Sequence, residues 1–172
     1  MKNRIAALAC AGLIAGASSA LAEPLEVDII GGEGASIGTA TLHDAPTGVL
    51  MRIEIGEDGL EPGWHGMHLH SVGDCSDVGT FKLSKGHINF DDKEHGLLNA
   101  NGPDNADLPN IYADDDGAAN AELLTTLVTI SGDRGLMDED GSALVIHANE
   151  DDHMTQPIGG AGGRVACGVI GG

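Results

Sequence analysis

Histidines are the residues of this 172-residue chain best suited to do chemistry, and their spacing indicates metal binding. His68 and His70 are separated by one residue, and side chains i and i+2 of a β-strand point the same way. On a strand, two imidazoles therefore project together from one face, while Met67 and Leu69 project from the other, toward the core. That geometry suits two ligands of one metal ion. Two solvated histidines on a surface strand are the alternative.

Further metal-binding residue types follow along the chain. His87 and His95 precede Asp104 and Asp107, a set of histidines and carboxylates of the kind that binds Zn²⁺. His147 ends a short apolar run. Taken alone, the first set also fits an acidic solvated loop, and a lone histidine such as His147 is more often structural than a ligand. It is the combined order of these residues that favours a metal centre.

Short strands are the elements expected to position these residues. The predicted strands are 25–30, 36–42, 49–55, 66–70, 123–130, 143–147 and 165–170. Gly- and Pro-containing turns separate several of them, and no segment has a convincing 3.6-residue period. From Val72 to Ala121 alternation is weak, and a long irregular segment of this kind is usually functional or disordered. Because it contains histidines, we favour function, and the strand pattern predicts an antiparallel sandwich or barrel.

The charge of the chain excludes several classes of function. It has 27 acidic and 8 basic side chains, a formal net charge of −19. The basic start Met1–Arg4, the apolar run after it and the cleavage pattern Ala20-Leu21-Ala22 predict a secretory signal peptide over residues 1–22. Removing two cations and no acid leaves 27 acidic and six basic side chains over 23–172, a net charge of −21. We therefore expect no nucleic-acid partner, because phosphate contacts need Lys and Arg, and no membrane partner.

The remaining chain, 23–172, is predicted to be one domain, since no linker or repeat divides it. Cys10 lies in the predicted signal peptide; a lipoprotein cleavage site there is the rival interpretation, although Ala7-Leu8-Ala9 matches it poorly. Cys75 and Cys167 remain after cleavage. Two cysteines in an oxidising compartment most simply form one disulfide.

Four motifs together resemble the copper/zinc superoxide dismutase family. They are Gly63-Trp64-His65-Gly66-Met67-His68-Leu69-His70 with Gly73-Asp74-Cys75, Asp107-Leu108-Pro109-Asn110, Val145-Ile146-His147, and Gly162-Gly163-Arg164-Val165-Ala166-Cys167-Gly168-Val169-Ile170. The long spacing from Cys75 to His87 and the short segment 153–163 are similar to the bacterial exported, or periplasmic, branch. The resemblance implies an all-β fold, an eight-stranded antiparallel Greek-key β-barrel or sandwich with long metal-binding and active-site loops.

The resemblance also implies roles for the matching residues. The copper ligands are matched by His68, His70, His87 and His147. The zinc ligands are matched by His87, which bridges the two metals, and by His95, Asp104 and Asp107. The remaining matches are Arg164 for the anion-guiding arginine, Asp151 for the aspartate that links copper-side and zinc-side histidines, and Cys75 and Cys167 for the family disulfide. His65 matches a structural histidine and is assigned no metal, and His43 is expected to be a surface residue. His153 lies near the active-site loop, where a ligand role is the less favoured alternative.

Asp104 departs from the family pattern, which has a third histidine at this position. Either an oxygen of Asp104 ligates zinc, or the shorter side chain leaves the position to water. We therefore expect a retained but weakened zinc site. Equilibrium dialysis that found zinc held as tightly as in an Asp104→His variant would contradict this.

The function implied by the resemblance is conversion of superoxide to O₂ and hydrogen peroxide by cycling of His-bound copper next to zinc. In this scheme His87 leaves reduced copper and carries a proton. The alternative is an exported copper-binding or copper-buffering homologue with low turnover. Arg164 and His87 favour the enzyme, because storage needs neither an anion guide nor a bridge. The expected location is the periplasm, and a homodimer is the candidate assembly.

Most cations of residues 23–172 lie in the predicted metal-site segments. Lys82, Lys85 and Lys93 lie in the irregular stretch, and Arg164 lies beside the expected copper site. We hypothesise that the lysines form a cationic funnel for the anionic substrate, since local fields can raise on-rates by roughly 10–10³. Ordinary solvated loop lysines are the alternative, and unchanged rates after neutralising all three would favour it.

Overall fold

Strands make up nearly all the regular structure of residues 23–171, the part of the chain that the computed structural model describes. They are β1 (Leu25–Gly31), β2 (Ser36–Ala45), β3 (Gly48–Ile55), β4 (Gly63–His65), β5 (Met67–His70), β6 (Ile111–Ala113), β7 (Ala119–Thr125), β8 (Ser142–His147) and β9 (Arg164–Ile170). The short 3-10 helix η1 (Lys82–Ser84) follows β5. Within 23–171, no helix has the length and apolar character needed to cross a membrane. The predicted signal peptide lies outside the described residues.

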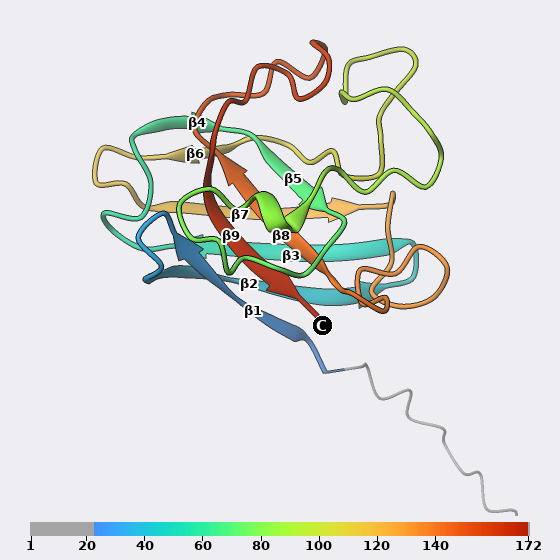
Figure 1. Cartoon of the computed structure of the whole chain (residues 1–172), viewed down its shortest axis with the longest axis horizontal. Coiled ribbons are helices and arrows are strands. Elements are labelled where there is room, and N and C mark those ends of the chain that lie inside the picture. The colour runs from blue at the N-terminus through green and yellow to red at the C-terminus, as the bar shows by residue number, and fades with distance from the viewer. Residues whose placement is uncertain (1–22, 172) are drawn as a thin grey trace, which may run out of the picture.

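The strands form a curled antiparallel sheet that confirms the expected barrel (Figure 1). Seven strands pair in the order β5-β8-β9-β1-β2-β3-β7, and β4 pairs with β6. β4 and β5 are halves of one extended segment divided at Gly66, and β6 also lies beside β7, which closes the barrel. With β4 and β5 counted as one strand, the barrel has eight strands. The connections from β3 to β4 and from β7 to β8 join strands that are not neighbours, as in a Greek key.

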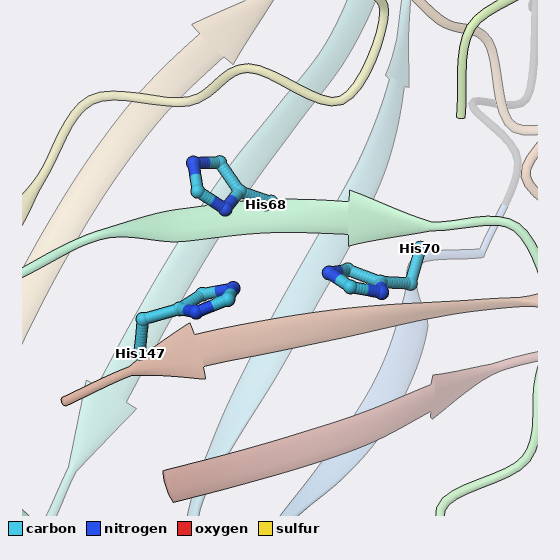
Figure 2. Close-up of side chains that lie close together, drawn as sticks. All are labelled: His68, His70 and His147. Atoms are coloured by element: carbon cyan, nitrogen blue, oxygen red, sulfur yellow. The ribbon is translucent and has the colours of Figure 1, made fainter. Parts of the chain in front are cut away.

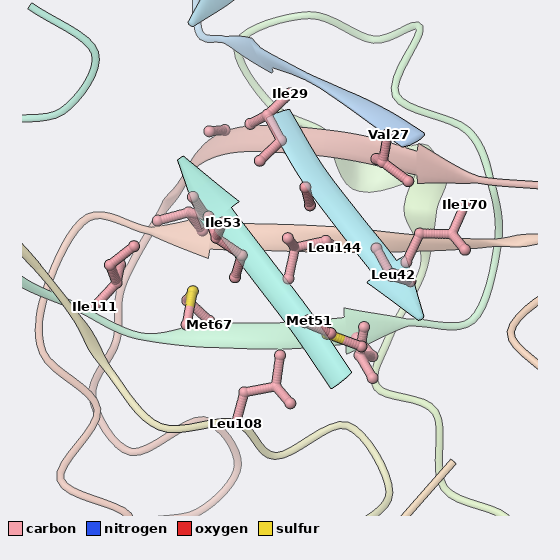
Figure 3. Close-up of a cluster of buried hydrophobic side chains, with 14 of the residues drawn as sticks. Val27, Ile29, Leu42, Met51, Ile53, Met67, Leu108, Ile111, Leu144 and Ile170 are labelled. Carbon is pink, nitrogen blue, oxygen red and sulfur yellow. The ribbon is translucent and has the colours of Figure 1, made fainter. Parts of the chain in front are cut away.

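The barrel interior is an apolar core (Figure 3). Every second residue of β5 belongs to it. Met67 and Leu69 pack in this core with Met51 and Leu144. Because side chains alternate along a strand, His68 and His70 point away from the core, as their spacing predicts. Loops cover that outer face, so all four residues of β5 are buried.

The prediction of a strand over 123–130 is wrong in its position. The observed strand β7 begins at Ala119 and ends at Thr125. Its inward positions include the small residues Ala119 and Ala121, which pair with Ile55 and Ile53. Alanine gives a weak strand signal, whereas the Leu-, Thr- and Val-rich run favours a strand that continues to 130, although β7 ends at Thr125. The short strands β4 and β6 were not predicted separately, because each has only three residues.

Two long loops cover the outer face of β5 and β8 and contact each other (Figure 1). One connects β5 to β6, and the other, 148–163, connects β8 to β9. The backbone N–H of Leu98 donates to the carbonyl of His153 across them. Gly66 permits this close cover, because a Cβ there would lie 2.9 Å from Cβ of Ala161. The predicted disulfide Cys75–Cys167 is present and ties the first loop to β9.

Candidate metal centre

Three histidines from two neighbouring strands converge on the outer face of the barrel. His68 and His70 project from β5, and His147 projects from the end of β8 (Figure 2). Antiparallel pairing of β5 with β8 brings the strands into register. One ring nitrogen of each histidine lies within 4.8 Å of the others, and all three side chains are buried.

Each of these imidazoles has one nitrogen held by an oxygen acceptor. The distances are 2.8 Å from His68 Nε2 to Asp151 Oδ2, 2.8 Å from His70 Nδ1 to the Lys85 carbonyl, and 3.1 Å from His147 Nδ1 to the Gly162 carbonyl. The second nitrogens, Nδ1 of His68 and Nε2 of the other two, are buried and have no hydrogen-bond partner among residues 23–171. A neutral imidazole that donates from one nitrogen offers a lone pair at the other. Three buried lone pairs are therefore available to a metal, and imidazole suits copper.

The protonation of the three histidines also suits metal binding. Burial lowers the pKa of His68, and it lowers the pKa of His70 to about 2, with Arg164 nearby adding to the effect. Burial, together with the charge of His68, lowers the pKa of His147 to about 4. The rings are therefore neutral at pH 7, the form that a metal requires of a histidine ligand.

His87 lies between this group and a second group of possible ligands. Its ring centroid lies 4.3 Å from that of His68 and 5.5 Å from that of His95. Nδ1 of His87 lies 2.8 Å from Oδ2 of Asp104, and its Nε2 is buried without a partner among the described residues. The second group comprises His87, His95, Asp104 and Asp107, with ligand atoms within 4.8 Å of one another. Two imidazoles and two carboxylates are donors that Zn²⁺ accepts.

Asp151 contacts one histidine of each group. Its Oδ2 accepts from His68, and its Oδ1 lies 3.1 Å from Nε2 of His95. Burial acts against ionisation of Asp151, but the hydrogen bonds from these histidines outweigh it and hold the pKa of its carboxyl well below the usual range. Such carboxylates fix the tautomer and ring orientation of metal ligands.

His95 is strongly influenced by carboxylates on both sides. Its Nδ1 lies 2.5 Å from Oδ1 of Asp107 without the alignment of a hydrogen bond, and both atoms are buried and otherwise unpaired among the described residues. Burial alone would lower the pKa of His95, but Asp107 and Asp151 together raise it to about 10. An imidazole nitrogen and a carboxylate oxygen are both ligand atoms that Zn²⁺ accepts, and these two face each other.

Arg164 lines a cavity beside the histidines. The cavity has a volume of about 780 Å³, and its lining includes His70, His87 and His147. Nη1 of Arg164 donates to the Phe81 carbonyl at 2.5 Å and to Ser84 Oγ at 3.1 Å, and Nη2 donates to the Lys85 carbonyl at 2.6 Å. These bonds hold the guanidinium at the edge of the cavity.

The three lysines of the funnel hypothesis are not equivalent. Lys82 and Lys93 line the cavity, whereas Lys85 is not among its lining residues. All three are exposed. The part of Lys85 that acts at the site is its backbone carbonyl, which accepts from Arg164 and His70.

Several residues that position the site were not assigned roles from the sequence. Ser84 is fully buried and contacts Arg164. Asn110 donates to the Asp151 carbonyl and accepts from the Asp151 backbone N–H, and Gln156 makes the equivalent pair of bonds with His95. Asn110 belongs to the motif Asp107-Leu108-Pro109-Asn110 that resembles the family, whereas no local sequence pattern indicates a role for Ser84 or Gln156.

The other histidines lie outside both ligand groups. His65 is buried. Its Nδ1 lies 2.7 Å from the carbonyl of His147, and its Nε2 lies 2.7 Å from the carbonyl of Glu61. His43 is exposed on β2. Nδ1 of His153 lies 3.4 Å from Asp151 Oδ2, and His153 is in none of the groups whose ligand atoms converge among residues 23–171.

Similar proteins share both the sequence and the fold. Residues 36–170 match the family model described as copper/zinc superoxide dismutase (SODC). "Superoxide dismutase [Cu-Zn]" of Caulobacter vibrioides is 51% identical over 143 residues, covering 81% of this chain and 80% of that protein. "Superoxide dismutase [Cu-Zn] 2" of Aquifex aeolicus is 42% identical over 173 residues, covering 99% of each chain.

Solved structures agree with these sequence matches. A double mutant of a SOD-like protein from Bacillus subtilis superposes with a TM-score of 0.80 at 32% identity, covering 86% of this chain and 97% of that chain. Cu/Zn superoxide dismutase from Brucella abortus superposes with a TM-score of 0.69 at 26% identity, covering 86% of this chain and 99% of that chain. Given the extent of the family match and the level of identity, this chain belongs to the copper/zinc superoxide dismutase family.

Proposed function

We propose that this chain is an exported superoxide dismutase whose reaction turns two superoxide anions and two protons into O₂ and hydrogen peroxide. One observation carries the proposal: four neighbouring imidazoles each have a buried, unpaired nitrogen, and three of them line a cavity together with Arg164. The family to which the chain belongs uses copper and zinc, and the donor atoms present fit both.

The proposed zinc set is one of the converging groups, and the proposed copper set adds His87, which lies between the groups, to the converging His68, His70 and His147. Copper would be held by His68, His70, His87 and His147, and zinc by His87, His95, Asp104 and Asp107. Bound copper supplies the one-electron redox cycle that the reaction needs, whereas zinc has no redox chemistry.

The protein's own residues bind the anion and handle the proton. The guanidinium of Arg164 stays charged at every working pH and is held at the cavity edge, where it attracts superoxide. His87 lines the cavity and its Nε2 has no hydrogen-bond partner among the described residues, so we assign to this atom the transfer of a proton to the reduced substrate. Asp151 keeps His68 and His95 in position during turnover.

The copper-buffering alternative is not favoured, because the arginine and the cavity serve an anionic substrate and the relatives above bear the name superoxide dismutase. Export to the periplasm is supported by the predicted signal peptide and by the disulfide. A homodimer is the proposed assembly, which sedimentation equilibrium would test.

Metal analysis of the purified protein combined with pulse radiolysis of superoxide tests the function. We expect copper and zinc in the protein and a second-order loss of superoxide that is abolished in His68→Ala. The matched control is His43→Ala, which removes an exposed histidine of β2 and should leave the rate unchanged. Bound copper without any dismutation would overturn the proposal in favour of a buffering protein.

A further inference from the structure

We infer that Asp104 is a positioning residue that holds His87 in its copper-binding orientation without the help of zinc. The inference rests on the proposed function, because it concerns the same copper ligand. It assigns to Asp104, a zinc ligand in the proposed function, a second task that it performs while the zinc position is empty.

The first support is the pattern of hydrogen bonds around the four imidazoles. In His68, His70 and His147, an oxygen acceptor engages one nitrogen and leaves the other unpaired on the copper side. His87 follows the same pattern, with Nδ1 held by Asp104 and Nε2 unpaired. Because a carboxylate can only accept, this contact selects the tautomer that carries its proton on Nδ1 and its lone pair on Nε2.

The second support is the distance between the two side chains. Two ligands of a tetrahedral zinc, each about 2.0–2.1 Å from the metal, are separated from each other by roughly 3.3 Å. Nδ1 of His87 and Oδ2 of Asp104 are 2.8 Å apart, which is the length of a hydrogen bond to a charged acceptor. In the protein without zinc, the contact therefore has the geometry of a direct hydrogen bond.

The third support is that Asp104 is itself rigidly held. Its side chain is almost fully buried, and its Oδ1 accepts from the Ala106 backbone N–H at 2.9 Å. Its own backbone N–H donates to Asp107 Oδ2 at 3.0 Å. With one oxygen anchored in the loop, the other is free to serve His87. A neutral histidine at this position has a single free lone pair and cannot serve both partners.

The consequence is a copper site that depends less on zinc. A carboxylate or carbonyl that orients a metal-binding histidine typically contributes roughly 10–100-fold to metal affinity or activity. We therefore expect copper to bind with four imidazoles in protein from which zinc has been omitted. Asp104→Ala should lower copper affinity by about 10–100-fold under the same zinc-free conditions.

Two spectroscopic measurements on the full chain test this. Nitrogen NMR of the metal-free protein should find His87 protonated at Nδ1 and not at Nε2. In zinc-free protein loaded with Cu²⁺, electron paramagnetic resonance should show four nitrogen ligands, reduced to three in Asp104→Ala. Asp104→Asn retains one acceptor oxygen for two donors, Nδ1–H of His87 and the backbone N–H of Ala106. Its copper affinity should therefore lie between those of the wild type and Asp104→Ala. Asp133→Asn, which removes an exposed carboxylate with no side-chain hydrogen bond among the described residues, is the matched control and should behave as wild type.

The outcomes separate this inference from the proposed function. An Nε2-protonated His87, or copper spectra and affinities identical in wild type and Asp104→Ala, would overturn the role of Asp104 while leaving an active enzyme intact. The NMR measurement needs no substitution, so a variant that fails to fold does not prevent the test. If the doubly loaded wild-type protein fails to remove superoxide, the proposed function fails independently.

Discussion

At the scale of single residues, the side chain of Arg164 is held by three hydrogen bonds. Two of its nitrogens donate to Phe81, Ser84 and Lys85, which leaves the guanidinium little freedom to move. Burial lowers the pKa of Arg164, yet an arginine remains charged throughout the working range. A fixed cation at the cavity edge attracts an anion without any cost of reorganisation.

Arg164→Ala should therefore slow the second-order reaction with superoxide by about tenfold and weaken its dependence on ionic strength. Arg52→Ala is the charge-matched control, because Arg52 is exposed on β3 and pairs with Glu122 away from the cavity. Pulse radiolysis at several salt concentrations measures both effects. Equal losses in the two variants would show that net charge, and not the placed guanidinium, sets the rate.

At the scale of elements, β9 and the loop after β5 are coupled through one small cluster. Cys75, Phe81 and Cys167 pack together, with Val145 of β8 completing the contact. The carbonyl of Phe81 accepts from Arg164, which lies at the start of β9. The disulfide therefore stabilises the loop that holds the side chain of Arg164.

Replacing both Cys75 and Cys167 by alanine should lower the free energy of unfolding by about 2–4 kcal/mol, because the bridge constrains the unfolded chain. It should also reduce the dismutation rate at full copper occupancy, because Phe81 loses its packing partners and Arg164 its fixed acceptor. Urea denaturation and pulse radiolysis of the metal-loaded variant measure the two effects. A variant with lowered stability but full activity would show that the loop keeps its position without the bridge.

At the scale of the whole molecule, a strongly acidic protein receives an anionic substrate. Exposed charges are largely screened beyond ~8 Å at physiological salt, so charges near the cavity have more influence than the net charge of the chain. Lys82 and Lys93 line the cavity, and Lys85 does not.

We expect the combined change Lys82→Gln and Lys93→Gln to slow the reaction by several-fold, up to about tenfold at low salt. Lys85→Gln changes the net charge by one while leaving the cavity lining and the Lys85 carbonyl in place, so it should have little effect. Rates measured by pulse radiolysis at several ionic strengths distinguish an effect of the cavity lysines from an effect of net charge. An effect of Lys85→Gln as large as half that of the double change would favour long-range net charge.

The stability of the metal-free protein should also depend on pH, with a maximum near pH 6.5. The pKa values of His70 and His147, about 2 and about 4, lie below the ordinary value of 6.5, so the unfolded chain binds more protons as pH falls from 6.5 toward 4, and stability is lost. The pKa of His95, about 10, lies above 6.5, so the folded protein binds more protons between pH 6.5 and 10, and stability is lost as pH rises. Urea denaturation at a series of pH values measures this; stability that increased steadily from pH 6.5 to 9 would contradict it.

How far the fold could be predicted depended on how strong each local pattern is. The strands β1, β3, β8 and β9 carry runs of apolar residues and were located to within about one residue of their observed bounds. The start of β7 was missed because its buried face begins with Ala119 and Ala121. Alanine side chains give only a weak signal for a buried strand. The three-residue strands β4 and β6 form through pairing with each other, for example of Gly63 with Ala113, and this pairing is not visible in either segment alone.

The sequence by itself determined the donor types and their order along the chain, because the His68–His70 spacing, the motif around His147 and the two late cysteines are local patterns. Only the tertiary structure decided which nitrogen of each imidazole is engaged and which is unpaired. It also decided that Asp104 bonds to His87, 17 positions earlier, and that Ser84 lies against Arg164, 80 positions later. The physical reason is that these contacts depend on how two loops pack over one face of a barrel, and a local sequence pattern records the residues of each loop but not the contacts between them.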